Sequence, residues 1–177
     1  MEIVTIIANN TVTKEFPISQ YILEALVVGG DAGRIRIEPL SLFATIVIVF
    51  ASWIRKECYR RLGKLFTFEL GIQADHKLVT TGPYAVVRHP SYTAGCLVSY
   101  GTICFHGSRG SWLRESGILD TTIGTTLANA FMMLMLYFMI LVKKRCEKED
   151  KALKKKFGNQ WDEWAQRVPY AALPGVF

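Results

Sequence analysis

Long apolar runs alternate with strongly basic blocks along this chain, a pattern typical of a small polytopic membrane protein. The apolar residues predict membrane spans near 40–54, 91–106 and 118–142. The first run is short, because a full crossing takes about 20 residues, and its Ile, Val and Phe content leaves a buried strand as the competing interpretation. Its length favours a helix. We therefore expect an all-α protein with several membrane helices.

The N-terminal region is mixed in character. Ile18–Val28 is apolar but contains Glu24, and it is too short to cross a bilayer. We interpret this stretch as an interfacial helix or as the remnant of a span. The chain is therefore predicted to have two parts, an N-terminal segment over 1–38 that is lumenal or interfacial, and a membrane domain over 39–177.

Lysine and arginine are concentrated in the loop at 55–90 and in the tail at 143–177. Basic residues accumulate on the cytoplasmic flanks of membrane spans, so both segments are predicted to face the cytoplasm. The turn at 107–117 and the N-terminus then face the other side. The spans at 91–106 and 118–142 form a hairpin that returns the chain to the cytoplasm.

Composition agrees with a membrane protein and adds a positive charge. Half of the residues are hydrophobic (50%), and the formal net charge is +6. A basic chain can bind nucleic acid, but here the basic residues flank apolar runs and no nucleic-acid-binding motif occurs, so we expect membrane lipid as the partner. The four cysteines form no CxxC and no zinc-binding spacing, so neither a disulfide scaffold nor a metal site is expected.

A first block of candidate functional residues precedes the second predicted span. Gly82-Pro83 predicts a turn, and Pro90 suits the first turn of a helix. Arg88-His89 would then lie at a helix N-terminus on the membrane surface, where free backbone N–H groups can hold an anion. Tyr84 and Tyr92 could contact a planar ligand. The alternative is an ordinary interfacial anchor of aromatic and basic residues.

A second block follows the third predicted span. Arg145 and Glu149 are four residues apart, so they share one face of a helix. An arginine can bind a carboxylate through two parallel hydrogen bonds, and a glutamate can receive an ammonium group. An amino-acid-like ligand carries both groups. The alternative is a salt bridge on a solvated helix face.

The two blocks are far more specific together than apart. LVTTGPY-x3-RHPSY, from Leu78 to Tyr92, is followed by an apolar hairpin and then by R-x3-E-D-x2-L-x3-FG-x2-W-x2-W-x3-VP, from Arg145 to Pro169. This arrangement resembles the isoprenylcysteine carboxyl methyltransferase family, part of a wider membrane group with phospholipid methyltransferases and sterol reductases. The resemblance covers roughly residues 40–177.

The resemblance implies S-adenosylmethionine as the cofactor, bound in a cytoplasmic pocket built from a loop and the C-terminal helical tail. It implies that Glu149 holds the cofactor's amino-acid end and that Arg145 binds the substrate carboxylate. The catalytic residues carried over by position are Arg145 and Arg88. The cofactor-binding residues carried over are Gln73, His76, Lys77, Leu78, Val79, Tyr84, His89, Pro90, Ser91, Tyr92 and Glu149.

The implied activity is methylation of the C-terminal carboxylate of prenylated cysteine, in the endoplasmic reticulum membrane with the site facing the cytoplasm. Its partners would be prenylated protein C-termini and membrane lipid, without a metal or nucleic acid. The sequence departs from the family at Asp150, where a second Glu is usual, and at Trp161 and Trp164, where Tyr is common. The family also has more spans before the first block than the single short one here.

Two alternatives remain open from the sequence. A phospholipid amine methyltransferase would need a base to remove a proton from the amine, and Glu149 or His89 could supply it. A membrane structural or adaptor protein without activity is the alternative of another class. A sterol reductase has less support, because nothing in the chain resembles a site for a nicotinamide phosphate.

Overall fold

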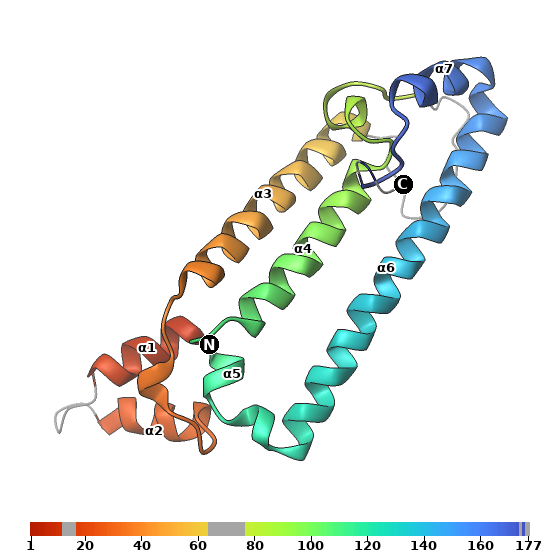
Figure 1. Cartoon of the computed structure of the whole chain (residues 1–177). Coiled ribbons are helices and arrows are strands. Elements are labelled where there is room, and N and C mark those ends of the chain that lie inside the picture. Colours follow the sequence, from red (N-terminus) through yellow and green to blue (C-terminus); the bar gives the residue numbers. More distant parts are fainter. Residues whose placement is uncertain (12–16, 64–76, 174, 176–177) are drawn as a thin grey trace. The chain divides into compact units, whose positions relative to one another are not determined.

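The computed structural model describes residues 1–11, 17–63, 77–173 and 175, and every regular element within these ranges is a helix. The all-α prediction is therefore confirmed (Figure 1). The α-helices are α1 (Glu2–Thr11), α2 (Pro17–Leu26), α3 (Pro39–Leu62), α4 (Pro90–Gly107), α5 (Trp112–Glu115), α6 (Thr122–Phe157) and α7 (Asn159–Arg167). The short 3-10 turns are η1 (Ala32–Arg34), η3 (Gly82–Ala85) and η4 (Ile118–Asp120).

Two of the described helices, α3 and α6, are long and apolar enough to cross a membrane. Only 17% of the most apolar window of α3 and 6% of that of α6 is buried within the protein. Water would make such exposed apolar surface unfavourable, whereas lipid does not. The uncharged parts of the two helices, 39–54 and 122–142, are their candidate membrane-spanning segments.

The ends of the helices differ from the ends of the apolar runs, and the predicted spans stay predictions. Helix α6 begins at Thr122, because η4 occupies Ile118–Asp120 and Thr121 accepts a hydrogen bond from the backbone N–H of Gly124 at 3.0 Å. A threonine in this position caps a helix N-terminus. Both α3 and α6 also continue well past the apolar runs, to Leu62 and Phe157, so their helical ends carry the basic residues that follow these runs.

Helix α4 coincides with the span predicted at 91–106, and Pro90 is its first residue as expected. It has 18 residues but is not among the two helices apolar enough to cross on their own, so its crossing stays a prediction. Its small residues permit close helix packing. A Cβ atom on Gly101 would lie 2.7 Å from Cγ1 of Ile48 and 3.2 Å from the carbonyl oxygen of Ala44, both on α3.

The chain divides into two compact units, and α3, α4 and α6 each contribute to both. The first unit comprises residues 1–48 and 99–135, and the second comprises residues 49–98 and 136–177. The predicted division between 1–38 and 39–177 separates an N-terminal segment from the membrane domain rather than two compact units, and it stays a prediction.

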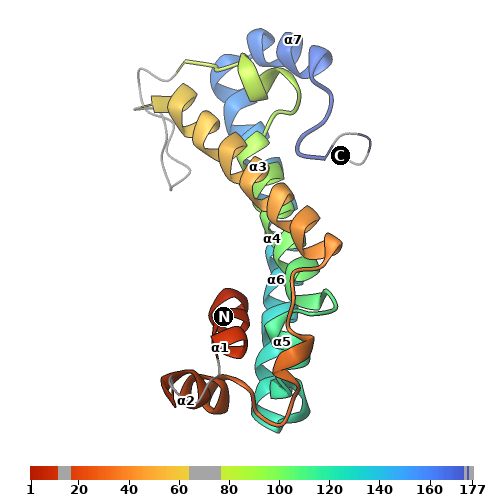
Figure 2. The ribbon, with the colours of Figure 1, turned by 90° about the vertical axis from the view of Figure 1, so that its left-hand side faces the viewer.

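Within the first unit, α1 and α2 pack as a pair of short helices, as Figure 2 shows. Their interface is small and polar, with the Thr11 and Ser19 hydroxyls 3.0 Å apart. The indole N–H of Trp112 donates to the Leu26 carbonyl at 2.8 Å, which ties α2 to α5. The region before α3 is therefore helical and packed, and its interfacial location stays a prediction.

Within the second unit, two apolar clusters lie beside the candidate site. One cluster is formed by α4, α6 and the C-terminal tail, and it contains Cys96, Val142, Cys146, Ala171 and Ala172. The other joins α3, η3 and α7, with Cys58, Tyr84, Trp164 and Val168 at its centre. These clusters fix the N-terminus of α4, the part of α6 around Val142 and Cys146, and the tail relative to one another.

Candidate active site

The loop that leads into α4 is held by α7. Gly82 has φ +64° and opens the turn η3, where a residue with a side chain would be strained. Tyr84 in this turn is buried, and its carbonyl accepts a hydrogen bond from the indole N–H of Trp164 at 3.2 Å. Burial raises the pKa of the Tyr84 hydroxyl, so Tyr84 stays neutral and serves to pack the loop.

The C-terminal tail closes over the start of α4. The backbone N–H of Arg88 donates to the Tyr170 carbonyl at 3.0 Å, and that of His89 donates to the Ala171 carbonyl at 2.7 Å. These two N–H groups are therefore not available to an anion, because backbone carbonyls of the tail already accept from them; the expected anion site at the helix N-terminus stays a prediction. The tail instead fixes the backbone position of Arg88 and His89, from which their side chains extend.

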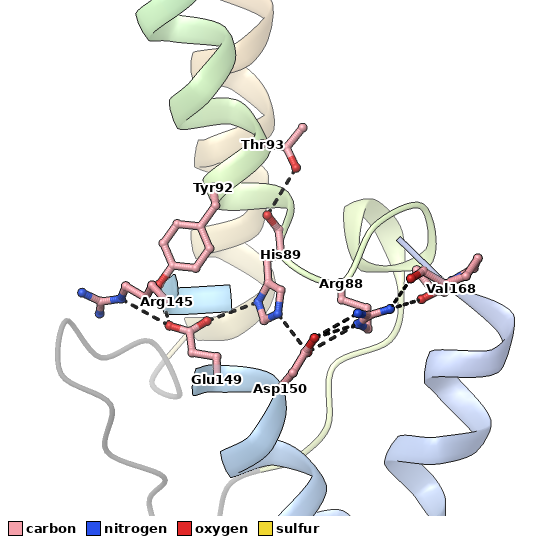
Figure 3. Close-up of polar contacts among 9 residues, drawn as sticks. Arg88, His89, Tyr92, Thr93, Arg145, Glu149, Asp150 and Val168 are labelled. Atoms are coloured by element: carbon pink, nitrogen blue, oxygen red, sulfur yellow. Dashed lines mark hydrogen bonds and ion pairs between the residues drawn. The ribbon is translucent and has the colours of Figure 1, made fainter. Parts of the chain in front are cut away.

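The side chain of Arg88 makes its contacts within the protein. Its guanidinium donates to Asp150 on α6, with the closest contact at 2.9 Å, and to the Val168 and Pro169 carbonyls at 2.9 and 2.6 Å (Figure 3). It also lies over the ring of Trp161, 5.8 Å from its centroid. These contacts join α6 to the end of α7, and they leave the predicted catalytic role of Arg88 as a prediction.

His89 lies between two carboxylates. Its Nε2 atom is 2.9 Å from Asp150 and its Nδ1 atom is 3.2 Å from Glu149, while only 5% of the side chain is exposed. Burial by itself lowers the pKa of the imidazole, but the hydrogen bonds to Asp150 and Glu149 outweigh it, so the pKa of His89 is raised. A protonated ring can donate to both carboxylates at once.

Glu149 is held from three sides. It accepts a hydrogen bond from the Tyr92 hydroxyl at 2.5 Å, faces His89, and accepts from Arg145 Nε at 3.5 Å. Glu149 lies beyond the membrane-spanning part of α6. Burial raises the pKa of its carboxyl, but the hydrogen bonds from His89 and Tyr92 prevail and lower it. The same balance, with His89 and Arg88 as donors, lowers the pKa of Asp150.

The result is a row of alternating charges, Arg88–Asp150–His89–Glu149–Arg145, drawn together in Figure 3. Side-chain exposure is lowest at the central His89, at 5%, and it rises toward one end of the row, to 26% at Glu149 and 43% at Arg145. Arg145 also lies over the Tyr92 ring, 5.9 Å from its centroid. The accessible end therefore presents a carboxylate and a guanidinium side by side.

This arrangement differs from the ordinary surface salt bridge that the sequence left open. The Arg145–Glu149 pair is present, but Glu149 also binds the buried His89 and the hydroxyl of Tyr92. An exposed pair contributes little and can adopt many geometries, whereas three partners restrict Glu149 to one. The site can thus offer a fixed carboxylate to a cation such as an ammonium group.

The structure brings some of the predicted site residues together and leaves others apart or undescribed. His89, Tyr92, Glu149 and Arg145 meet, and Pro90-Ser91 forms the adjoining first turn of α4. The remaining described ones belong to the loop before α4: Lys77 is exposed, Leu78 and Val79 pack on the second cluster, and Tyr84 lies in its centre. Gln73 and His76 lie outside the described residues.

Sequence reasoning misses the part that Asp150 and the tail carbonyls play. It identifies Asp150 only as a departure from a resemblance, although Asp150 binds both Arg88 and His89. Its place directly after Glu149 is the one available signal. Backbone carbonyls at Val168–Ala172 carry no sequence signature, because any residue supplies the same acceptor.

Comparison with known proteins gives matches over most of the chain. Residues 44–108 match the isoprenylcysteine carboxyl methyltransferase family. The chain is 30% identical over 136 residues to protein-S-isoprenylcysteine O-methyltransferase B of Arabidopsis thaliana, covering 73% of this chain and 57% of that protein. It is 27% identical over 139 residues to a probable protein-S-isoprenylcysteine O-methyltransferase of Oryza sativa subsp. indica, covering 77% and 62%.

A solved structure resembles this one as well. The eukaryotic intramembrane Ras methyltransferase, an isoprenylcysteine carboxyl methyltransferase, matches with a TM-score of 0.58 and 26% identity, covering 96% of this chain and 52% of that one. A Δ(14)-sterol reductase of Septoria lycopersici is 29% identical over 115 residues, but these make up only 21% of the reductase.

This chain spans 57% and 62% of the two plant relatives named above. The structural match and the two exposed apolar helices agree that it is an integral membrane protein. One group is indicated by the sequence matches, by the shared fold and by the residues at the start of α4 that carried the resemblance. The chain is similar to the isoprenylcysteine carboxyl methyltransferase family.

Proposed function

We propose that this chain transfers a methyl group from S-adenosylmethionine to the C-terminal carboxylate of a prenylated cysteine. The family supports the reaction class, and the observation that carries the proposal is the pairing of Glu149 with Arg145 at the accessible end of the charge row. S-adenosylmethionine supplies a methyl group on a positively charged sulfur. The chain must hold this molecule and the carboxylate in the right geometry.

Glu149 fits the amino-acid end of the cofactor. Its pKa is lowered, so it is ionised at neutral pH, and 26% of its side chain remains exposed. An ionised carboxylate fixed by His89 and Tyr92 can accept charge-assisted hydrogen bonds from an ammonium group. Other predicted cofactor residues, from Lys77 to Val79 and from Pro90 to Tyr92, lie on the loop before α4 and on the first turn of α4.

Arg145 is the proposed partner of the substrate carboxylate. Its guanidinium has several donors, so it can keep one on Glu149 and offer others to a second carboxylate. A C-terminal carboxylate has a pKa of about 3.3–3.7 and is already ionised at neutral pH, so no strong base is required. Orientation by Arg145, with one carboxylate oxygen left facing the methyl group, supplies the catalysis.

The protonation states disfavour the phospholipid amine methyltransferase. Methylating an amine requires the amine to lose a proton to a base. The described candidates are poorly suited, because the pKa of Glu149 is lowered and both nitrogens of His89 face carboxylates. A carboxylate nucleophile needs neither group as a base, so the site fits carboxyl methylation better.

The proposed location is the endoplasmic reticulum membrane, with the site on the cytoplasmic side. Lys143-Lys144-Arg145 directly follows the spanning part of α6, and Arg55-Lys56 follows that of α3. Basic flanks of this kind mark the cytoplasmic side, and the site residues lie at the same ends of these helices. Prenylated protein C-termini, anchored by their lipid in the same membrane, would be the substrates.

A labelling experiment tests this proposal against its rivals. Purified protein in lipid nanodiscs is given S-adenosylmethionine with a labelled methyl group and either an S-farnesylcysteine analogue or phosphatidylethanolamine. We expect label in the farnesylcysteine product only. Label in phosphatidylethanolamine would support the amine methyltransferase, and label in neither would support the inactive structural protein.

A further inference from the structure

His89 has no exposed polar atom with which to meet a ligand. Its two ring nitrogens face Asp150 at 2.9 Å and Glu149 at 3.2 Å, and the side chain is only 5% exposed. The ring of Tyr92 covers it from α4, with the centroids 5.9 Å apart. The imidazole therefore contacts other protein groups, and any effect of its side chain on a bound cofactor has to pass through Glu149.

Asp150 is fixed independently of His89. Arg88 binds one of its oxygens at 2.9 Å, and the other oxygen faces His89. Arg88 is in turn held by the Val168 and Pro169 carbonyls. The position of Asp150 is thus set by Arg88 and the tail.

We propose that Asp150 and His89 are positioning residues for the cofactor, which hold Glu149 in the orientation that accepts the cofactor's ammonium group. This inference rests on the proposed function. Asp150 binds Nε2–H of a protonated His89, and the opposite N–H of the ring then fixes Glu149 through Nδ1. Neither residue touches the cofactor through its side chain.

The proton on His89 is essential to this arrangement. A neutral imidazole has one N–H, so it can donate to Asp150 or to Glu149 but not to both. Among the described residues, the titratable groups that face the ring are Asp150 and Glu149 on α6 and Tyr92 on α4, while Arg88 and Cys146 interact with the two carboxylates. The two carboxylates keep the ring protonated, and removal of either would release the proton at a lower pH.

The test compares Asp150→Asn with Asp150→Glu and with the control Glu147→Gln. The Asp150→Asn change keeps the size of the side chain but removes its charge, whereas Glu149 stays intact. Glu147 is exposed on the same helix, and its loss removes the same charge from a place outside the row. The probe is S-adenosylhomocysteine, whose dissociation constant is measured by calorimetry from pH 6 to pH 9 in detergent. Circular dichroism checks that each variant is folded.

We expect Asp150→Asn to weaken S-adenosylhomocysteine binding about tenfold or more, as is typical when a charged hydrogen-bond partner is lost. The pH above which binding weakens should also move lower. Asp150→Glu should restore both, since a carboxylate again faces His89, and Glu147→Gln should bind like the wild type. Equal affinity and an unchanged pH profile in folded Asp150→Asn would overturn the proposal, as would a loss that Asp150→Glu fails to restore.

The two proposals fail in different ways in this experiment. If wild-type protein binds S-adenosylhomocysteine but methylates no prenylcysteine, the proposed function fails while the positioning role is still decided by the variants. If wild type is active and Asp150→Asn binds equally well, only the positioning role fails. If wild type does not bind S-adenosylhomocysteine at all, both fail together.

Discussion

Replacing Glu149 with glutamine removes the negative charge at the accessible end of the row while nearly preserving its shape. Glutamine can still accept hydrogen bonds from Tyr92 and Arg145 through its amide oxygen, but its NH₂ group then faces Nδ1 of the protonated His89, which is also a donor. A charge-assisted hydrogen bond is worth about 1.5–3 kcal/mol. Loss of such a bond to the cofactor's ammonium group therefore predicts binding about 10- to 150-fold weaker.

The assay is calorimetric titration of detergent-solubilised protein with S-adenosylhomocysteine, which retains the amino-acid end but transfers no methyl group. Glu147→Gln is the matched control, because Glu147 is exposed on the same helix and stands outside the charge row. Binding by Glu149→Gln within twofold of the wild type would refute the assignment of Glu149 to the ammonium group. Equal weakening in Glu147→Gln would show that the effect is one of overall charge.

Three further predictions concern the substrate, the charge row and the packing of the helices. Arg145→Ala should reduce kcat/KM for a farnesylcysteine analogue at least tenfold while S-adenosylhomocysteine still binds, and loss of both would contradict its role toward the substrate. Because the pKa of His89 is raised on folding, its protonated ring stabilises the fold below about pH 6.5, and this contribution is lost as pH rises through the folded pKa. Because the pKa of Glu149 is lowered on folding, its carboxylate stabilises the fold above about pH 4, and this contribution is lost as pH falls through the folded pKa. The unfolding temperature should therefore be highest between about pH 4 and pH 6.5, and a profile that is flat from pH 3 to pH 9 would contradict the charged row. Gly101→Ala should lower the stability by about 1–3 kcal/mol, because its Cβ would lie 2.7 Å from Ile48, whereas Gly107→Ala meets nothing within 4 Å and should have little effect on the unfolding temperature.

Local sequence signals predict the parts of the site that one helix or one turn determines. Pro90 marks the start of α4, and the four-residue spacing of Arg145 and Glu149 places them on one face of α6. The positive φ of Gly82 likewise follows the predicted turn. These features depend on neighbours within a few residues, which is the range over which sequence patterns are informative.

The remaining features depend on contacts between distant residues. Arg88 binds Asp150 and the Val168 carbonyl, which lie 62 and 80 residues away in sequence. No local pattern indicates that the guanidinium of Arg88 will donate to backbone carbonyls, or that carbonyls of the tail will accept hydrogen bonds from the backbone N–H groups of Arg88 and His89. The apolar run begins before α6 because it extends across η4, whereas the cap at Thr121 sets the helix start.

Chemical identity of the product tests the central claim most directly. Purified protein is incubated with methyl-labelled S-adenosylmethionine and an S-farnesylcysteine analogue, and the extracted product is treated with mild base. A methyl ester releases its label as volatile methanol under these conditions, whereas a methylated amine or thioether retains it. The proposed function predicts release of volatile label in the wild type and little or none in Arg145→Ala. A product that keeps its label in base, or the absence of any labelled product, would contradict carboxyl methylation by this chain.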